Sequence, residues 1–343
     1  MDRRQLLLGV TALGLATNLN LNHLLAAQLG KANVASRPSD RERAGLRGSV
    51  KTCSNFVGTE TESMSEQEYA ADGRLLFWRG RIFTGSVESI YSYDGTGKLI
   101  RVTSSGSGAV DEFHYDEQGK KTRVRTVPPR PRQEGMQAGT EIMFEMAEEG
   151  DDLNGGGTVT TRYNDDDQPV ESLVRDAHGV LVTRITHNYA NGRLVVETLV
   201  RENLDLPKEF FEQPPGEQLS EQQRREMRAQ IKELLSQHGL DATERSYVYD
   251  NEGRVSRVTM QMSNVRIETS TTYNEHGDEA VTVRNQSGSL GEPTDSAKSA
   301  HIYTDRSEVR YFYEYDSHGN WTEKTDKTVD GSSFETLRKL TYY

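Results

Sequence analysis

Three histidines are the first residues whose type and spacing suggest chemistry. His178, His276 and His318 each stand directly before a glycine in a short turn-like sequence. Histidine is the commonest metal ligand, but a zinc site needs three or four ligands that converge on one ion. Each histidine belongs to a different copy of the turn, so we expect the three to be separated along a sheet edge. We interpret them as solvated turn residues, and no metal site is predicted.

The acidic residues suggest two further chemistries. The runs NDDDQ from 164 and EEGDD from 148 offer carboxylate oxygens to calcium, but they lack the alternate ligand spacing and central glycine of a calcium loop. Paired carboxylates also serve in glycoside hydrolysis, yet 53 acidic residues make any chosen pair uninformative. The motifs GxSxG and HExxH, phosphate loops and dinucleotide fingerprints do not occur. We therefore predict no catalytic residue and no cofactor.

Cys53 is the single cysteine of the chain. A nucleophilic cysteine needs a neighbouring base and an orienting group, and the local sequence SVKTCSNFV offers neither. We interpret Cys53 as a structural thiol. Disulfides need cysteine pairs, so an exported protein of this sequence must rely on packing.

The composition narrows the class of protein. Only 34% of the 343 residues are apolar and the mean hydropathy is -0.76, so many strands are expected to keep one wet face. The 15 Tyr, 9 Phe and 2 Trp argue against disorder. The net charge of -12 argues against nucleic acid or an anionic membrane surface as partner, because phosphate binding needs a basic footprint.

A repeated short sequence is the strongest signal in the chain. The string YDxxG begins at Tyr93, Tyr115, Tyr249 and Tyr315. Looser copies begin at Tyr69, Tyr163 and Tyr273, and two more read RDAHG from 175 and NYANG from 188. Neighbouring copies are 22 to 26 residues apart where nothing is inserted, which is the length of two strands and two turns. We therefore expect about nine hairpins.

The repeated residues have a physical role in a turn. Asp or Asn at the first position accepts a backbone hydrogen bond, and Gly at the fourth takes positive φ without a Cβ clash. This pattern predicts a type I turn closed by a glycine bulge between antiparallel strands. The predicted turn residues are Asp94, Gly97, Asp116, Gly119, Asp250, Gly253, Asn274, Gly277, Asp316 and Gly319.

Aromatic side chains precede the turns at alternate positions. Tyr311, Tyr313 and Tyr315 are expected on one strand face and Glu314 on the other. Stacked hairpins would line up such aromatics across strands. They can form the core, which we favour because aliphatic residues are few, or an exposed platform on which sugar rings stack. The candidate platform residues are Tyr91, Tyr93, Tyr115, Tyr247, Tyr249, Tyr313, Tyr315 and Trp321.

The pattern Tyr-Asp-x-x-Gly followed by an apolar residue resembles the YD repeats of the RHS (rearrangement hotspot) family. The resemblance covers about residues 65 to 127, 158 to 200 and 244 to 343. It implies an extended antiparallel sheet of successive hairpins in an exported or surface-displayed protein; some members enclose a toxin, and some mediate adhesion or carbohydrate contact. This chain has fewer copies than the large members and no DPxGL-type motif, which puts a closed cargo shell in doubt.

Three insertions interrupt the hairpins. Residues 128–157 and 286–300 have loop-like compositions rich in Pro, Gly and Ser. Residues 201–243 contain a predicted helix near 220–238, with Ser220 as N-cap, Gln223 completing a capping box and Gly239 ending it. Its narrow apolar stripe is expected to pack on the sheet rather than on a partner or membrane. The stripe consists of Met227, Ile231, Leu234 and Leu235.

The amino terminus resembles a twin-arginine export signal. Arg3 and Arg4 precede an apolar run from Leu6 to Ala16 that is too short to span a bilayer. An ordinary amphipathic N-terminal helix is the alternative. We assign residues 1–35 to this signal and a linker, 36–64 to an N-terminal extension, and 65–343 to the hairpin domain. No transmembrane span beyond the signal is expected.

Together these features predict a mainly β protein. We expect one extended, twisted or partly closed antiparallel sheet of repeated hairpins with one inserted α-helix. The expected function is that of an exported, non-catalytic interaction module, periplasmic or on the cell surface, contacting an envelope protein or glycan. The alternatives are an envelope polysaccharide hydrolase and a companion or immunity protein to a larger RHS-type secreted protein. The oligomeric state stays open, because edge strands can pair between chains.

Overall fold

The computed structural model shows a single β-sheet of eighteen strands in the described part of the chain. The structure describes residues 38–58, 60, 62–82, 85–129, 156–203, 241–290 and 301–343, with positions 220, 222, 223, 226, 229, 230, 232, 233 and 236. The strands are β1 (Val50–Val57), β2 (Ser65–Tyr69), β3 (Leu75–Ile82), β4 (Gly85–Tyr93), β5 (Leu99–Ser104), β6 (Val110–Tyr115), β7 (Lys121–Val127), β8 (Gly157–Tyr163), β9 (Pro169–Asp176), β10 (Leu181–Ala190), β11 (Arg193–Arg201), β12 (Ala242–Tyr249), β13 (Val255–Met262), β14 (Val265–Tyr273), β15 (Glu279–Leu290), β16 (His301–Tyr315), β17 (Trp321–Thr328) and β18 (Ser333–Tyr342).

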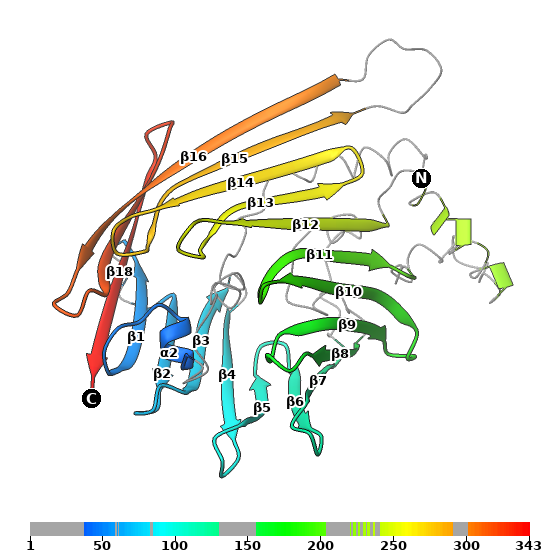
Figure 1. Ribbon diagram of the computed structural model, residues 1–343, viewed down its shortest axis with the longest axis horizontal. Coiled ribbons are helices and arrows are strands. Elements are labelled where there is room, and N and C mark those ends of the chain that lie inside the picture. Colours follow the sequence, from blue (N-terminus) through cyan, green and yellow to red (C-terminus); the bar gives the residue numbers. More distant parts are fainter. Residues whose placement is uncertain are drawn as a thin grey trace.

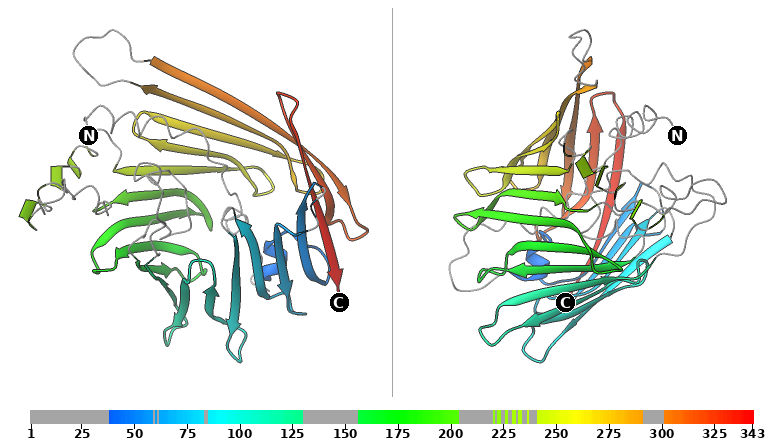
Figure 2. Two further views of the ribbon diagram at one scale, coloured as in Figure 1. Left: turned by 180° about the vertical axis from the view of Figure 1, so that it is seen from behind. Right: turned by 90° about the vertical axis from the view of Figure 1, so that its right-hand side faces the viewer.

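The sheet closes on itself as a barrel. Each strand pairs antiparallel with the next along the chain, so the strands follow the ring in chain order (Figures 1 and 2). β1 pairs with β18, from Val57 opposite Thr336 to Val50 opposite Tyr342. The expected extended or partly closed sheet is therefore wrong. Closure occurs because β1, from the segment assigned to an N-terminal extension, offers the edge that β18 needs, and both free edges disappear.

We call the pairing of β1 with β18 the seam, and the segment before β1 forms hydrogen bonds beside it. The short helix α2 (Asp40–Arg43) is followed by Arg47, whose backbone N–H donates to Asn320 Oδ1 at 2.7 Å. Asn320 Nδ2 donates back to the carbonyl of Arg47 at 2.9 Å, and Asn320 is buried. A buried cluster packs beside this contact, consisting of Leu46, Val50, Cys53 and Tyr69. Cys53 thus lies inside a packed cluster, and burial raises the pKa of its thiol.

The two ends of the barrel differ in their connections. Turns from even-numbered to odd-numbered strands gather at one end, which we call the tyrosine rim because the even strands end there in tyrosine. The insertions at 128–157, 201–243 and 286–300 all connect strands at the opposite end, which we call the insertion rim. The long insertions are therefore confined to one end of the barrel. β15 and β16 project past their neighbours at the insertion rim (Figure 1).

The predicted insertions fall only partly within the described residues. Residues 286–290 continue β15, whereas 291–300 and 130–155 lie outside the described part. The described positions from 222 to 236 are helical, and Ser220 exchanges hydrogen bonds with Gln223. The predicted apolar stripe of this helix lies outside the described residues. No helix in the described ranges is long and apolar enough to cross a lipid bilayer.

The two faces of the sheet have different chemistry. Cross-strand partners share a face, so the face that carries Tyr115 and Phe113 also carries Thr161 and Ser172, both buried. We call this the tyrosine face. Burial of side chains on this face is expected if it is the concave side of the closed sheet, because side chains converge there. A small apolar core lies on it, consisting of Ala109, Val127, Val159, Val174 and Val182.

The opposite face, the charged face, carries arginines that bridge carboxylates on neighbouring strands. Arg79 contacts Glu66 at 3.1 Å and Glu88 at 2.8 Å. Arg184 likewise contacts Glu171 at 2.7 Å. The arginines of these pairs are exposed to solvent, so each pair is worth only about 0 to 1 kcal/mol. Because positive and negative side chains alternate across the strands, this face stays hydrated.

The turn glycines allow a direct test of the backbone argument. Gly97 has φ +86, and an added Cβ would meet nothing closer than Arg74 Nη1 at 3.4 Å. We expect Gly97→Ala to lower the free energy of unfolding by about 1 to 2 kcal/mol, because a side chain disfavours the left-handed region. Gly95, in the same turn, has no positive φ and open space around it, so Gly95→Ala is the matched control and should cost nothing. Urea unfolding of both variants measures the difference; equal losses would refute the argument.

Candidate functional site

The tyrosine rim carries a tyrosine at the last or next-to-last position of every even-numbered strand. These residues are Tyr69, Tyr93, Tyr115, Tyr163, Tyr189, Tyr249, Tyr273, Tyr315 and Tyr342. Five of their hydroxyls donate to a backbone carbonyl at the beginning of the preceding strand. The bonds are Tyr93 to Leu75 (2.7 Å), Tyr115 to Leu99 (3.0 Å), Tyr189 to Pro169 (2.8 Å), Tyr249 to Leu194 (2.7 Å) and Tyr273 to Val255 (2.7 Å).

These five bonds share one position relative to the backbone ladder. Leu75 lies two residues before Phe77, where pairing between β3 and β4 begins. Val255 likewise lies two residues before Arg257, the first partner of β14. The same offset holds at the other three carbonyls. The tyrosine hydroxyl therefore replaces the backbone donor where two hairpins diverge at the rim. We call these five bonds the tyrosine clamps.

The seam uses other donors for the same purpose. Arg41 of α2 donates from Nη1 to the carbonyl of Val50, the first residue of β1, at 3.2 Å. Tyr342 instead donates to the carboxylate of Asp316. Tyr315 donates to Asp278 Oδ2 at 2.9 Å. The rim is thus bonded from hairpin to hairpin, including across the point of closure.

Cations and histidines cover the faces of these tyrosines. The Arg74 guanidinium lies 4.9 Å from the ring centroid of Tyr93, and that of Arg254 lies 4.5 Å from Tyr273. In each case the cation follows the turn glycine of the previous hairpin. A histidine directly before the turn glycine can cover a tyrosine in the same way: His276 stacks on Tyr315 with ring centroids 4.0 Å apart.

The three turn histidines do not converge on one point. His276 and His318 lie on the tyrosine rim, and His318 stacks on Tyr342 at 4.3 Å. His178 lies in the turn between β9 and β10, at the insertion rim. Within the described ranges, no group of three or more His, Cys, Asp or Glu side chains is placed to hold a metal ion.

The turn residues form one recurring arrangement. The side-chain oxygen of Asp94 accepts backbone hydrogen bonds from Thr96 at 2.8 Å and Lys98 at 2.9 Å. Asp116, Asp250, Asn274 and Asp316 accept from the residues two and four positions later in the same way. Positive φ is found at Gly97, Gly119, Gly253, Gly277 and Gly319.

The aromatic residues considered for a ligand platform are spread around the barrel. Tyr91 and Tyr93 lie on β4, Tyr115 on β6, Tyr247 and Tyr249 on β12, Tyr313 and Tyr315 on β16, and Trp321 on β17. The last three lie together, with ring centroids 5.9 Å apart for Tyr313 and Tyr315 and 6.3 Å apart for Tyr313 and Trp321. Tyr247 and Tyr249 belong to a separate cluster. The guanidinium of Arg338 lies 3.3 Å from the Trp321 ring. The eight residues do not make one continuous surface.

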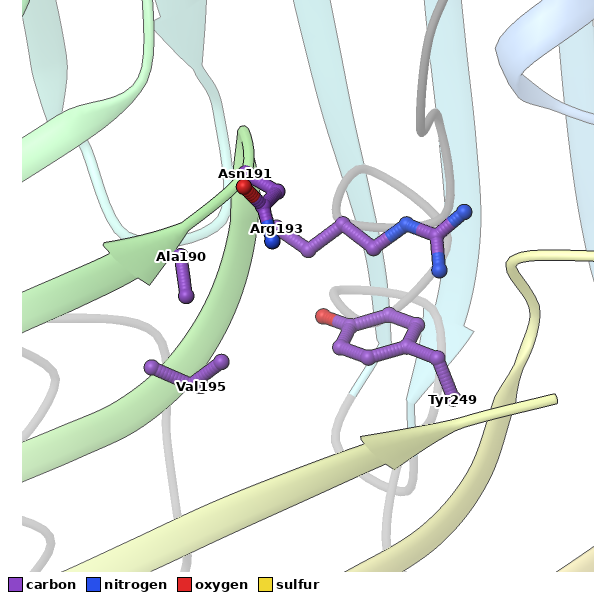
Figure 3. Close-up of a pocket in the computed structure, with 5 residues that line it drawn as sticks. All are labelled: Ala190, Asn191, Arg193, Val195 and Tyr249. Atoms are coloured by element: carbon purple, nitrogen blue, oxygen red, sulfur yellow. The ribbon is translucent and has the colours of Figure 1, made fainter. Parts of the chain in front are cut away.

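One hairpin of the tyrosine rim leaves a gap. β10 and β11 are joined by the two-residue turn Asn191-Gly192, whereas the other turns at this rim have five residues between the strands. Beside this short turn lies an open pocket of about 410 Å³, lined by Ala190, Asn191, Arg193, Val195 and Tyr249 (Figure 3). We call this pocket the notch.

The notch contains a cation that is not neutralised by an acid. Arg193 follows the short turn, and its guanidinium lies 5.3 Å from the ring centroid of Tyr249 (Figure 3). No carboxylate in the described ranges lies within ion-pair distance of it. Burial raises the pKa of Tyr249, and the Arg193 charge opposes that rise. None of the described residues that line the notch carries a carboxylate.

Sequence reasoning missed Arg193 and Asn191. The dipeptide Asn-Gly between two strands is a strong signal for a two-residue hairpin turn. The sequence NYANG was instead grouped as a loose copy of the four-residue repeat. The difference of three residues between this turn and the other rim turns is the signal that could have revealed the notch.

No family model matches the chain, and no curated protein matches it. The resemblance to YD repeats therefore has no support from a family model. Among solved structures, a porin-like protein from Bacteroides uniformis is similar over 86% of this chain and 99% of its own, with 10% identity and a TM-score of 0.38. The Tc holotoxin pore of Photorhabdus luminescens is similar over 81% of this chain and 16% of its own, with 10% identity and a TM-score of 0.18. MucB in complex with MucA(peri) is similar over 85% of this chain and 88% of its own, with 11% identity and a TM-score of 0.12. At these TM-scores the likenesses carry no argument about this chain.

The tyrosine clamps predict the effect of removing a single oxygen atom. Tyr189→Phe deletes the donor to the Pro169 carbonyl and should lower the free energy of unfolding by about 1 kcal/mol. Tyr313→Phe is the matched control, because the described residues place no hydrogen-bond partner at the Tyr313 hydroxyl. Chemical denaturation of both variants tests this. A loss at Tyr313 as large as that at Tyr189 would show that the hydroxyl bond is not the cause.

Two tyrosines whose hydroxyls are partly or fully shielded from water also predict sensitivity to alkali. Burial raises the pKa of Tyr247 to about 12 and that of Tyr315 to about 12. Because these values exceed the unfolded value of about 10, the associated stability is fully present below about pH 10 and is lost as the pH rises toward 12. Tyrosinate absorbance and circular dichroism, followed together, should show ionisation coinciding with unfolding. Complete ionisation near pH 10 in a folded barrel would contradict the prediction.

Proposed function

We propose that the protein is a non-catalytic interaction module of the cell envelope that binds its ligand at the tyrosine rim. The observation that carries this proposal is the notch, where a short turn exposes Arg193 and Tyr249 in an open pocket. At two other turns of the rim, the arginine in the same place is paired with an acid of its own turn, as Arg254 is with Asp250 at 2.7 Å and Arg74 is with Asp72 at 2.7 Å. A cation beside an aromatic ring in an open pocket is typical of a binding site.

We place the barrel in an aqueous compartment. Charged residues occur on the tyrosine face, where Arg245 contacts Glu197 at 2.8 Å, as well as on the charged face. An arginine on a lipid-facing strand costs about 2 to 4 kcal/mol at the membrane midplane, so neither face suits lipid. The export-like amino terminus supports a location outside the cytoplasm, either in the periplasm or at the cell surface, and a relation to YD-repeat proteins fits such a location.

Blocking the notch tests the proposed function. The full chain, immobilised and exposed to glycan arrays and to envelope extracts, should retain a ligand. Ala190→Trp places a bulky side chain at the exposed notch wall and should abolish that retention without changing the thermal midpoint. Ala71→Trp, in an exposed turn of the same rim, is the matched control and should bind normally. Absence of any ligand, or full retention by Ala190→Trp, would refute the proposal.

A further inference from the structure

The geometry points to an acidic saccharide as the ligand of the notch, held through its carboxylate by Arg193. This inference rests on the proposed function and adds the chemical class of the ligand. It follows from the charge left by the short turn, from the way the guanidinium is positioned, and from the character of the opposite wall.

The short turn explains why Arg193 is available to an anion. Arg74 and Arg254 occupy the corresponding position after their turns, and each finds a carboxylate within its own turn. Asp72 lies 2.7 Å from Arg74, and Glu252 lies 2.8 Å from Arg254. Asn191 and Gly192 bring no carboxylate. A chain with a net charge of -12 thus keeps one uncompensated cation at this point of the rim.

Contacts on both sides hold the guanidinium in place. The guanidinium lies over the ring of Tyr249, whose hydroxyl donates to the Leu194 carbonyl at 2.7 Å. An added Cβ at Gly253 would lie only 2.5 Å from Arg193 Nη2, so the neighbouring turn approaches the guanidinium closely. On the other side, Gln168 Nε2 donates to the carbonyl of Gly192 at 2.7 Å and braces the short turn. A positioned guanidinium offers two parallel N–H donors to a carboxylate.

The remaining wall suits the body of a sugar. Ala190 and Val195 supply a small apolar strip against which the C–H face of a pyranose can lie, and Asn191 adds an amide at the mouth (Figure 3). A volume of about 410 Å³ lies at the lower end of the range for small-molecule sites and has room for one or two sugar rings. Because the notch is open to solvent, the remainder of a polymer can extend past the rim.

Titration of the full chain with a galacturonic acid trisaccharide and with a neutral galactose trisaccharide tests this inference. The acidic ligand should bind about tenfold more tightly or better than the neutral one. Arg193→Gln should remove the preference for the acidic ligand. Arg193→Lys keeps the charge but loses the two parallel N–H donors of the guanidinium, so it should retain part of the preference. Arg254→Gln, at the matched position with its own acids, should bind like the unchanged chain. A thermal melt of each variant excludes unfolding as the cause.

The outcomes separate the two proposals. Equal binding of acidic and neutral trisaccharides, sensitive to Ala190→Trp, would overturn the acidic class and leave the notch as a binding site. Acidic binding unaffected by Arg193→Gln would overturn the assignment of Arg193. Displacement of the trisaccharide by acetate at equal concentration would reduce the site to a simple anion site and also overturn the inference. Binding of no saccharide and no envelope component would overturn the proposed function itself.

Discussion

Near the beginning of six odd-numbered strands, a backbone carbonyl takes its hydrogen bond from a side chain and not from the sheet. Pairing with the next hairpin starts two residues later, because the hairpins diverge at the rim. An unpaired backbone group that is shielded from water is costly, so a donor must come from elsewhere. The tyrosine at the end of the next strand provides it in five places, and Arg41 provides it at the first strand. The position of the tyrosine, the turn that follows it and the spacing of the hairpins all follow from this requirement.

The barrel distributes its stabilisation over many small contacts. In the part of the chain that the structure describes, three small, separate clusters of buried apolar side chains occur, and the one around Tyr247 has only Leu194 and Val255 as its other fully buried members. Most of the ion pairs on the charged face are exposed and contribute little singly. Repeated hydrogen bonds and ring contacts at the rim therefore contribute a larger share than they do in a protein with one large core. This explains how a chain with 34% apolar residues forms an ordered sheet.

Local features of the fold could be predicted from the sequence because the interactions that define them are local. The hairpin turn is specified within five residues, as in Asp316 to Asn320, and alternation along β16 assigns its two faces. Closure could not be predicted, because β1 has no repeat motif and its partner β18 lies at the other end of the described chain. The use of the tyrosine hydroxyls depends on strand register across hairpins, which no single repeat reveals. Arg193 was missed for a similar reason: its free charge is apparent only by comparison with the neighbouring turns.

The pairing of β1 with β18 has a consequence for how the chain reaches its folded form. Nearly every other strand contact joins neighbours in sequence, so hairpins can form and zip together early with little loop-closure entropy. The seam alone has a very high sequence separation. During synthesis β1 has one open edge until β18 emerges, and an open edge is a template for pairing with another chain. The segment from α2 to Arg47 packs at the rim beside the first hairpin, where Asp40 accepts from the backbone of Leu75. It can therefore cover the start of β1 before β18 is made, and it can then bind Asn320 when the last strands pair.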